Sequence, residues 1–117
     1  MFDLLTNAIA FIFALGVIIF VHEAGHLAAA KAFGMRVLAF SLGFGRKIWG
    51  FEHQGTEYKV SLVPLGGYVQ LGGENPDDEL TGDPSEFLSR PRWQRAIVYL
   101  AGPAMNFVLS ILLIGAV

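Results

Sequence analysis

The sequence contains no cysteine, and its positive charges are confined to one part of the chain. The absence of cysteine excludes disulfide bonds and a metal site built from thiolates. No Lys or Arg precedes Lys31, and residues 97–117 carry no charge. A cleaved signal peptide normally begins with a basic region and has an apolar segment of only about 7–15 residues. Because this chain begins Met1-Phe2-Asp3 and its first apolar segment is longer, we expect that segment to be retained.

Two apolar stretches dominate the sequence. Residues 4–30 contain only five strongly polar side chains: Thr6, Asn7, His22, Glu23 and His26. This stretch and residues 97–117 each reach the roughly 20 residues that cross a hydrocarbon core about 30 Å thick. The sequence therefore predicts a mainly α-helical membrane protein. Transmembrane helices within residues 1–34 and 96–117 are expected to be joined by a small membrane-associated antiparallel β region.

All 8 Lys and Arg residues lie between the two apolar stretches. By the positive-inside rule, the connecting segment is expected in the cytoplasm and both chain ends on the outer side. The pattern predicts a multi-pass protein of the cell's inner (plasma) membrane, in contact with the lipid bilayer. The basic residues are scattered or flank apolar segments, so nothing indicates nucleic-acid binding.

A His-Glu-x-x-His motif, His22-Glu23-Ala24-Gly25-His26, lies late in the first apolar stretch. On a helix, side chains four residues apart share a face, so His22 and His26 can bind one metal ion. Zn²⁺ suits nitrogen ligands and a site with one open position. Glu23, beside that face, can act as the general base in peptide-bond hydrolysis.

The alternative is that these polar groups only form hydrogen bonds with neighbouring helices. An ionised side chain within a membrane helix costs about 2.5 kcal/mol or more, and a bound metal would offset that cost. The motif in this setting therefore favours a metal site. The small residues around it would also let a second helix approach closely: Ala24, Gly25, Ala28, Ala29 and Ala30.

Residues 35–73 contain short β-like runs separated by glycines. Strands are predicted at residues 37–42, 47–51, 58–63 and 68–71. Turns are predicted at Gly43-Phe44-Gly45, His53-Gln54-Gly55 and Pro64-Leu65-Gly66-Gly67. Such a sheet either adds a substrate strand at its exposed edge or forms a structural cap over the active site.

Residues 74–95 are expected to form an acidic loop and an interfacial segment. We predict that the acidic side chains of this region are in water: Glu74, Asp77, Asp78, Glu79, Asp83 and Glu86. Ser89 and Pro91 suit the start of a helix, and Trp93 suits the membrane boundary.

The second apolar stretch contains Gly102-Pro103, which we expect to interrupt its helix, because proline lacks an N–H and displaces the carbonyl of Tyr99. Asn106 lies one turn further on. It is either a hydrogen-bonding contact between helices or, with Gly102 and Pro103, part of a substrate-binding site. A bend and an amide near a metal motif favour the second interpretation.

Four motifs together resemble the bacterial branch of the site-2 protease family. They are His22-Glu23-Ala24-Gly25-His26, Gly43-Phe44-Gly45, the run at residues 64–69 and the run at residues 101–107. The resemblance implies an intramembrane zinc metalloprotease that cuts transmembrane segments of proteins such as anti-sigma factors. It also implies Zn²⁺ on His22 and His26, Glu23 as general base, and Asn106 near the substrate.

One feature of that family is missing. Its third protein ligand is an aspartate of an Asp-Gly pair in a later transmembrane helix, and this sequence has no Asp-Gly pair. We therefore expect the chain to be the N-terminal portion of a longer protein, with an incomplete zinc site. Two alternatives remain: a non-catalytic membrane scaffold or degenerate protease that binds helical segments, and a membrane metalloprotease that clips soluble tails.

Overall fold

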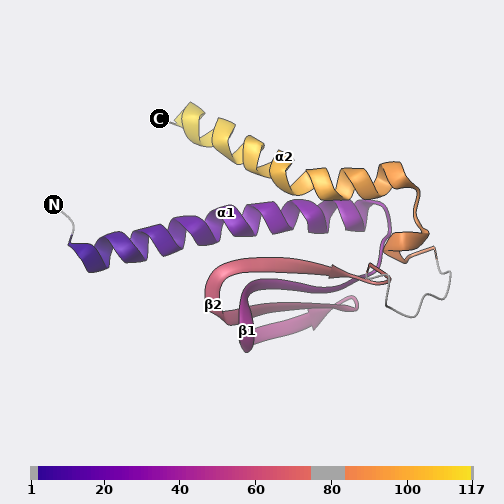
Figure 1. Ribbon diagram of the computed structural model, residues 1–117, viewed down its shortest axis with the longest axis horizontal. Helices are drawn as coiled ribbons and strands as arrows, with labels where there is room; N and C mark the ends of the chain where they lie inside the picture. Colours follow the sequence, from indigo (N-terminus) through magenta and orange to yellow (C-terminus); the bar gives the residue numbers. More distant parts are fainter. Residues whose placement is uncertain (1–2, 75–83, 117) are drawn as a thin grey trace.

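The computed structural model describes residues 3–74 and 84–116. Along the chain, helix α1 (Leu4–Ala32) is followed by strands β1 (Val37–His53) and β2 (Thr56–Leu71). A short 3₁₀ helix, η1 (Phe87–Ser89), then leads into helix α2 (Arg92–Ala116). Figure 1 shows α1 between α2 and the sheet, with the two helices diverging toward the chain ends. The two helices and the antiparallel sheet confirm the predicted elements.

The boundaries of α1 follow from its terminal residues. Asp3 caps the helix because its Oδ1 accepts a hydrogen bond from the Thr6 N–H at 2.7 Å. The helix ends at Ala32, within the predicted residues 1–34, and Gly34 adopts a positive φ of 74°. At that φ a residue without a Cβ is favoured, which is why the helix stops there. With 29 residues α1 is about 43 Å long.

The predicted β region forms one folded two-stranded ribbon. Its hairpin turn is at Gln54 and Gly55, both with positive φ, as a tight two-residue hairpin requires. The other two predicted turns are wrong: residues 43–45 lie inside β1 and residues 64–67 inside β2. Each strand bends at these glycines while its hydrogen-bond ladder continues with shifts in register.

The bends fold the ribbon back on itself. Ser41 of β1 pairs with Lys59 on one side and with Tyr68 on the other, so one segment of β1 lies between two segments of β2. Gly43 has a φ of 90°, and a Cβ there would lie 2.8 Å from the Val63 carbonyl oxygen. Only glycine allows that approach.

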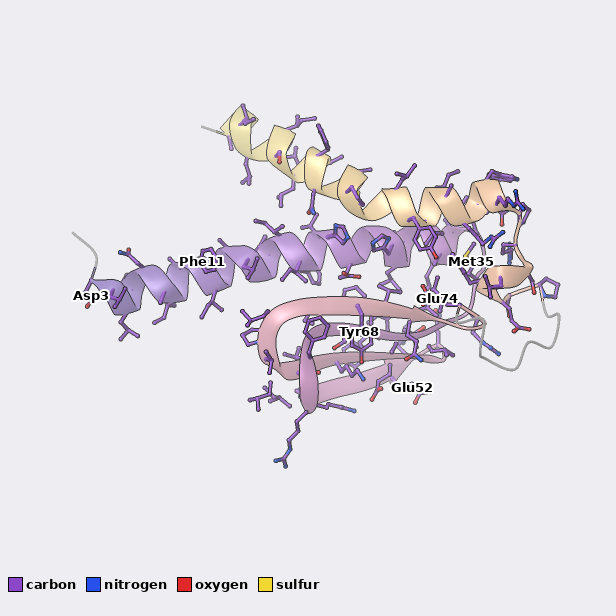
Figure 2. All side chains as sticks on the ribbon, viewed as in Figure 1. Asp3, Phe11, Met35, Glu52, Tyr68 and Glu74 are labelled. Atoms are coloured by element: carbon purple, nitrogen blue, oxygen red, sulfur yellow. The ribbon has the colours of Figure 1, made fainter. Side chains whose placement is uncertain are left out.

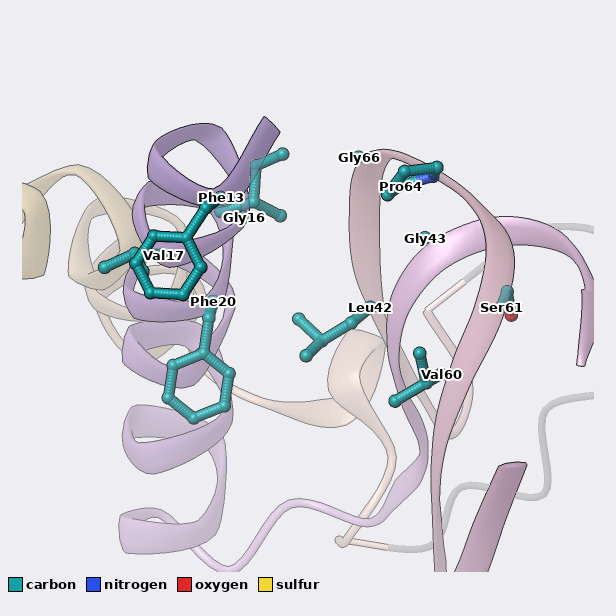
Figure 3. Close-up of a pocket in the computed structure, with 11 residues that line it drawn as sticks. Phe13, Gly16, Val17, Phe20, Leu42, Gly43, Val60, Ser61, Pro64 and Gly66 are labelled. Atoms are coloured by element: carbon teal, nitrogen blue, oxygen red, sulfur yellow. The ribbon is translucent and has the colours of Figure 1, made fainter. Parts of the chain in front are cut away.

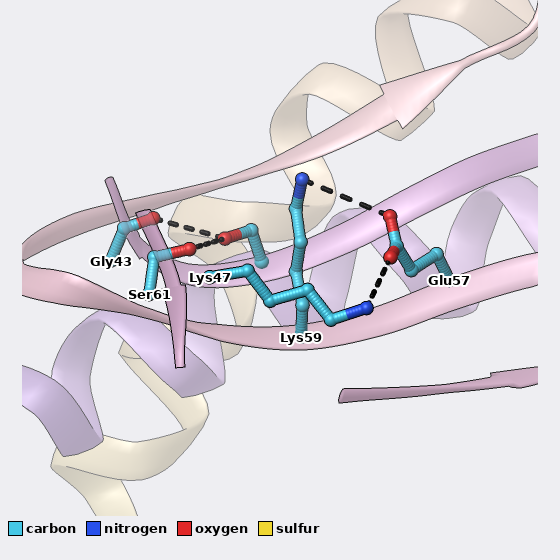
Figure 4. A network of polar contacts seen from close by, with 6 residues as sticks. Gly43, Lys47, Glu57, Lys59 and Ser61 are labelled. Atoms are coloured by element: carbon cyan, nitrogen blue, oxygen red, sulfur yellow. Dashed lines mark hydrogen bonds and ion pairs between the residues drawn. The ribbon is translucent and has the colours of Figure 1, made fainter. Parts of the chain in front are cut away.

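Polar contacts fix the ribbon on the side shown in Figure 4. Lys47 donates a hydrogen bond to Glu57 at 2.8 Å, and Lys59 lies 3.9 Å from the same carboxylate. Lys47 thereby lowers the pKa of the Glu57 carboxyl group below its usual value. In the same part of the ribbon, Ser41 Oγ lies 3.4 Å from Ser61 Oγ and donates to the Gly43 carbonyl.

A small core forms where the end of α1, the start of β1, the end of β2, η1 and the first part of α2 meet. It consists of Ala30, Met35, Val37, Leu71, Phe87 and Val98. Glu86 is also buried, with 1% of its surface exposed, so the prediction that it lies in water is wrong. The chain packs tightly here because Gly73, at a φ of 68°, leaves the space that the Glu86 side chain takes. Asp77, Asp78, Glu79 and Asp83 lie outside the described residues.

Helix α2 continues through Pro103, so the predicted interruption takes the form of a bend and does not end the helix. Proline removes one hydrogen bond and displaces one carbonyl, and here this bends the helix without ending it. Figure 1 shows the change of direction along α2. The helix tolerates the loss of a single backbone hydrogen bond because its other turns keep their backbone hydrogen bonds.

Both helices present apolar side chains outward. Leu4 is 86% exposed and Phe107 is 74% exposed, and Figure 2 shows that most side chains projecting from the outer parts of α1 and α2 consist of carbon. Both helices are long and apolar enough to cross a membrane by length and composition. In water, such a surface would be costly.

Candidate metal centre

The two histidines of α1 face each other and α2. His22 Nε2 lies 3.1 Å from His26 Nε2, and the ring centroids are 4.8 Å apart. This follows from the four-residue spacing, which places both imidazoles one turn apart on one face. Two nitrogen atoms therefore converge at one point between the helices.

The other nitrogen of each ring is held by α2. His26 Nδ1 lies 2.6 Å from the Val98 carbonyl oxygen, which can only accept, so Nδ1 donates. The Asn106 side-chain amide donates to His22 Nδ1 at 3.2 Å. Each ring is thus held in orientation by a hydrogen bond with α2, and His26, which donates its Nδ1–H, has the arrangement that is usual for a metal-binding histidine.

Gly102 makes room for the two imidazoles. A Cβ on Gly102 would lie 2.5 Å from His26 Nε2 and 2.8 Å from His22 Nε2. On α1, between the two histidines, a Cβ on Gly25 would lie 2.4 Å from the Ala101 carbonyl oxygen. The close approach expected from the small residues around the motif is therefore present, and it depends on glycine in both helices.

The paired imidazoles fit a zinc ion. Two nitrogen ligands at the usual Zn–N distance on a tetrahedral ion are about 3.3 Å apart, and the two Nε2 atoms are 3.1 Å apart. Within residues 3–74 and 84–116, no three His, Cys, Asp or Glu side chains form a group that could hold a metal. The described part of the chain thus offers two candidate ligands, His22 and His26.

Glu23 borders two cavities beside the histidines. A cavity of about 380 Å³ is lined by His22, Glu23, Asn106 and, from the sheet, Phe44, Leu65 and Gly67. A second, of about 200 Å³, is lined by Glu23, His26, Tyr68 and Tyr99 among others. Glu23 therefore borders the cavity next to each imidazole.

The sheet closes one side of this region. β2 passes so close to α1 that a Cβ on Gly67 would lie 3.4 Å from Glu23 Cγ. A neighbouring apolar cavity of about 320 Å³ separates α1 from the strands. Figure 3 shows Phe13, Val17 and Phe20 of α1 opposite Leu42 and Val60 in this cavity. An extended apolar segment would fit its character.

The residues predicted for the site are distributed as follows. His22, His26, Gly102 and Asn106 come together between the helices, and Glu23 lies beside them. Pro103 lines another cavity, of about 440 Å³, that His22 and Asn106 also border.

Sequence reasoning missed the contribution of Val98, because a backbone carbonyl leaves no signal in the sequence. It also missed Phe44 and Leu65 as lining residues. The glycines beside them were noticed, but as turns. A glycine that packs against another element looks the same in sequence as a glycine in a turn.

Comparison with known proteins places the chain in a family. Residues 10–117 match the model of peptidase family M50. The chain is 44% identical to the regulator of sigma-E protease RseP of Salmonella typhimurium over 115 residues, and 43% identical to the protease RseP of Yersinia pestis over 115 residues. It is also 44% identical over 113 residues to a protein of Vibrio cholerae that carries the name of a zinc metalloprotease.

These alignments cover 95% of this chain and 25% of each of the three relatives. The chain thus spans about a quarter of the length of the relatives it matches. The names of these proteins agree with Zn²⁺ as the metal and with metalloprotease as the class of enzyme. The chain belongs to peptidase family M50, the site-2 protease family that its four motifs resemble.

Proposed function

We propose that the complete protein containing this chain is an intramembrane zinc metalloprotease. It hydrolyses peptide bonds in or near the transmembrane segments of membrane-protein substrates. The observation that carries this proposal is the pair of converging imidazoles, whose Nε2 atoms are 3.1 Å apart, on a helix long and apolar enough to cross a membrane. Polar ligands at such a position are costly unless they bind something.

Each residue has a distinct role in this proposal. His22 and His26 hold Zn²⁺ through their Nε2 atoms, with a further ligand from outside the described residues. Zinc, when bound, acts as a Lewis acid that acidifies water and polarises the scissile carbonyl. Glu23 takes the proton from the attacking water and delivers it to the leaving amine. The earlier prediction that Gly102, Pro103 and Asn106 contact substrate remains a prediction.

The membrane position is also part of the proposal. α1 and α2 cross the inner membrane, the connecting segment is cytoplasmic and both ends of this chain lie on the outer side. His22 is eighteen residues beyond Leu4, so it lies about 27 Å along the helix. That depth is near the cytoplasmic boundary of a hydrocarbon core about 30 Å thick, where water can enter.

We infer that the substrate is a transmembrane protein resembling an anti-sigma factor. The name of the Salmonella typhimurium relative, a regulator of sigma-E protease, supports this class of substrate. The apolar cavity between α1 and the strands is suited to a segment that has left its helical conformation, since β edges offer unpaired backbone groups.

The deciding experiment replaces Glu23 by Gln in the complete protein. We expect cleavage of a membrane-embedded substrate to be lost while zinc content and fold persist, because Gln keeps the shape but cannot accept a proton. Full cleavage by this variant would rule out the mechanism. If the unmodified protein held no zinc and His22→Ala changed nothing, the chain would instead belong to a non-catalytic scaffold.

A further inference from the structure

We propose that Asn106 is a positioning residue for His22, and that its Oδ1 accepts a hydrogen bond from His22 Nδ1–H when zinc is bound. This inference rests on the proposed zinc site. It assigns the Asn106 amide to a candidate metal ligand, whereas the sequence favoured a contact with substrate over a contact between helices. The evidence is the arrangement of protons and lone pairs around the two rings.

The hydrogen bonds of the structure form one continuous chain. The Asn106 amide N–H donates to His22 Nδ1, so the proton of the neutral His22 ring is on Nε2. That Nε2–H donates to His26 Nε2 at 3.1 Å, and His26 Nδ1–H donates to the Val98 carbonyl. In this arrangement His26 Nε2 has a lone pair for a metal, and His22 Nε2 does not.

The Oδ1 atom of Asn106 can change which nitrogen of His22 carries the proton. This atom is buried and has no hydrogen-bond partner in the described part of the chain. Buried amide oxygens normally have a donor. A half-turn of the amide about its last bond exchanges Oδ1 and Nδ2 without moving the backbone, and brings Oδ1 to His22 Nδ1.

After that rotation, His22 carries its proton on Nδ1 and donates it to Oδ1. Its Nε2 proton leaves to water and a water proton arrives at Nδ1, so the net charge of the ring is unchanged. Both Nε2 atoms then direct lone pairs to the same point. His22 acquires the tautomer that His26 already has through Val98.

Helix α2 is built for this arrangement. Val98, Gly102 and Asn106 are spaced four residues apart and share one face. Val98 supplies a carbonyl to His26, Gly102 leaves space opposite both Nε2 atoms, and Asn106 supplies an amide to His22. Partners that fix the tautomer of a metal-binding histidine affect metal affinity roughly 10- to 100-fold.

The test measures zinc affinity of the complete protein in detergent by competition with a chelator. Asn106→Leu removes the acceptor, and we expect zinc to bind roughly 10- to 100-fold more weakly. Asn106→Asp keeps an acceptor oxygen, and we expect it to restore affinity close to the unmodified protein. Ser110→Ala is the matched control on α2, because its hydroxyl donates only to the Asn106 backbone carbonyl.

Two outcomes would overturn the inference: unchanged zinc affinity in Asn106→Leu, or equal losses in Asn106→Leu and Asn106→Asp. A pure substrate contact would raise KM and leave zinc affinity unchanged. If the unmodified protein binds no zinc, the proposed function itself fails, which is a different result. A failure of the inference alone leaves zinc binding intact.

A second measurement needs no variant and so does not depend on whether Asn106→Leu folds. Nitrogen-15 NMR of histidine-labelled protein reports which ring nitrogen carries the proton. We expect His22 to carry it on Nε2 after zinc is removed and on Nδ1 after zinc alone is added back. A zinc-loaded protein without a proton on His22 Nδ1 would contradict the proposal.

Discussion

Gly102 of α2 lies directly opposite His26 of α1, so closely that a Cβ on Gly102 would be 2.5 Å from His26 Nε2. The same Cβ would meet His22 Nε2 at 2.8 Å. The contact shows that the space in front of the paired imidazoles exists because residue 102 has no side chain. Changes at this residue should therefore act on the metal centre directly.

We expect Gly102→Ala to weaken zinc binding and to destabilise the packing of α1 on α2 by about 1–3 kcal/mol, the usual cost of overpacking. The imidazole rings must move away from the added methyl group, which breaks their convergence. Zinc titration and thermal unfolding of the complete protein measure both effects.

Gly115→Ala is the matched control, because a Cβ at Gly115 meets nothing within 4 Å. It should leave zinc binding unchanged. Equal zinc binding and equal stability of Gly102→Ala and Gly115→Ala would contradict the close contact of residue 102 with the imidazoles.

Gly25→Ala tests the contact between the helices away from the imidazole nitrogens. Its Cβ would lie 2.4 Å from the Ala101 carbonyl oxygen, a backbone atom that cannot turn aside. We expect a loss of about 1–3 kcal/mol in stability. The comparison is Gly16→Ala in the same helix, where a Cβ meets nothing within 4 Å and alanine has the better helix propensity. The prediction is wrong if both variants unfold at the same temperature.

The Glu57 carboxyl group should titrate below its usual pKa of 4.5, because Lys47 donates a hydrogen bond to it. A lowered pKa in the folded state means that the ion pair stabilises the ribbon above the unfolded pKa. That contribution is lost as the pH falls through the folded pKa. Carbon-13 NMR of the Glu57 side chain measures the titration.

Lys47→Met is the control for this prediction, since it removes the ammonium group and keeps most of the side chain. The Glu57 pKa should then rise toward 4.5, with only a small change in stability, because the pair is exposed to solvent. An unchanged pKa would mean that Lys47 is not its cause.

The proposed topology can be tested with single cysteines, since the chain has none of its own. In the complete protein without other cysteines, Leu4→Cys should react with a membrane-impermeant thiol reagent applied to the outer side. Glu52→Cys, in the hairpin, should react only after the membrane is opened. Both side chains are exposed, so burial within the chain does not hide them. The reverse labelling pattern would invert the proposed orientation.

The sequence determined the local features of this protein. The apolar runs predict the two long helices, the Asp3 cap and Gly34 mark the boundaries of α1, and the four-residue spacing places His22 and His26 on one face. These features depend on interactions within about one helix turn. For the same reason the hairpin turn at Gln54 and Gly55 was predicted correctly.

The predictions that failed depend on contacts between distant segments. The glycines at residues 43–45 and 66–67 look like turn residues, but each strand continues through them because it packs against another segment of the ribbon. Glu86 looks like a solvated acid, but the core at η1 encloses it. No local pattern reveals what a neighbouring segment will cover.

The tertiary structure alone decided how the metal centre is assembled. Asn106 and His22 are 84 residues apart in the chain, and Val98 and His26 are 72 apart. Antiparallel packing of α2 on α1 places Asn106 against His22 and Val98 against His26, with Gly102 between Val98 and Asn106. The sequence could supply two candidate ligands and a candidate base, but only helix packing could fix the orientation of the two imidazole rings.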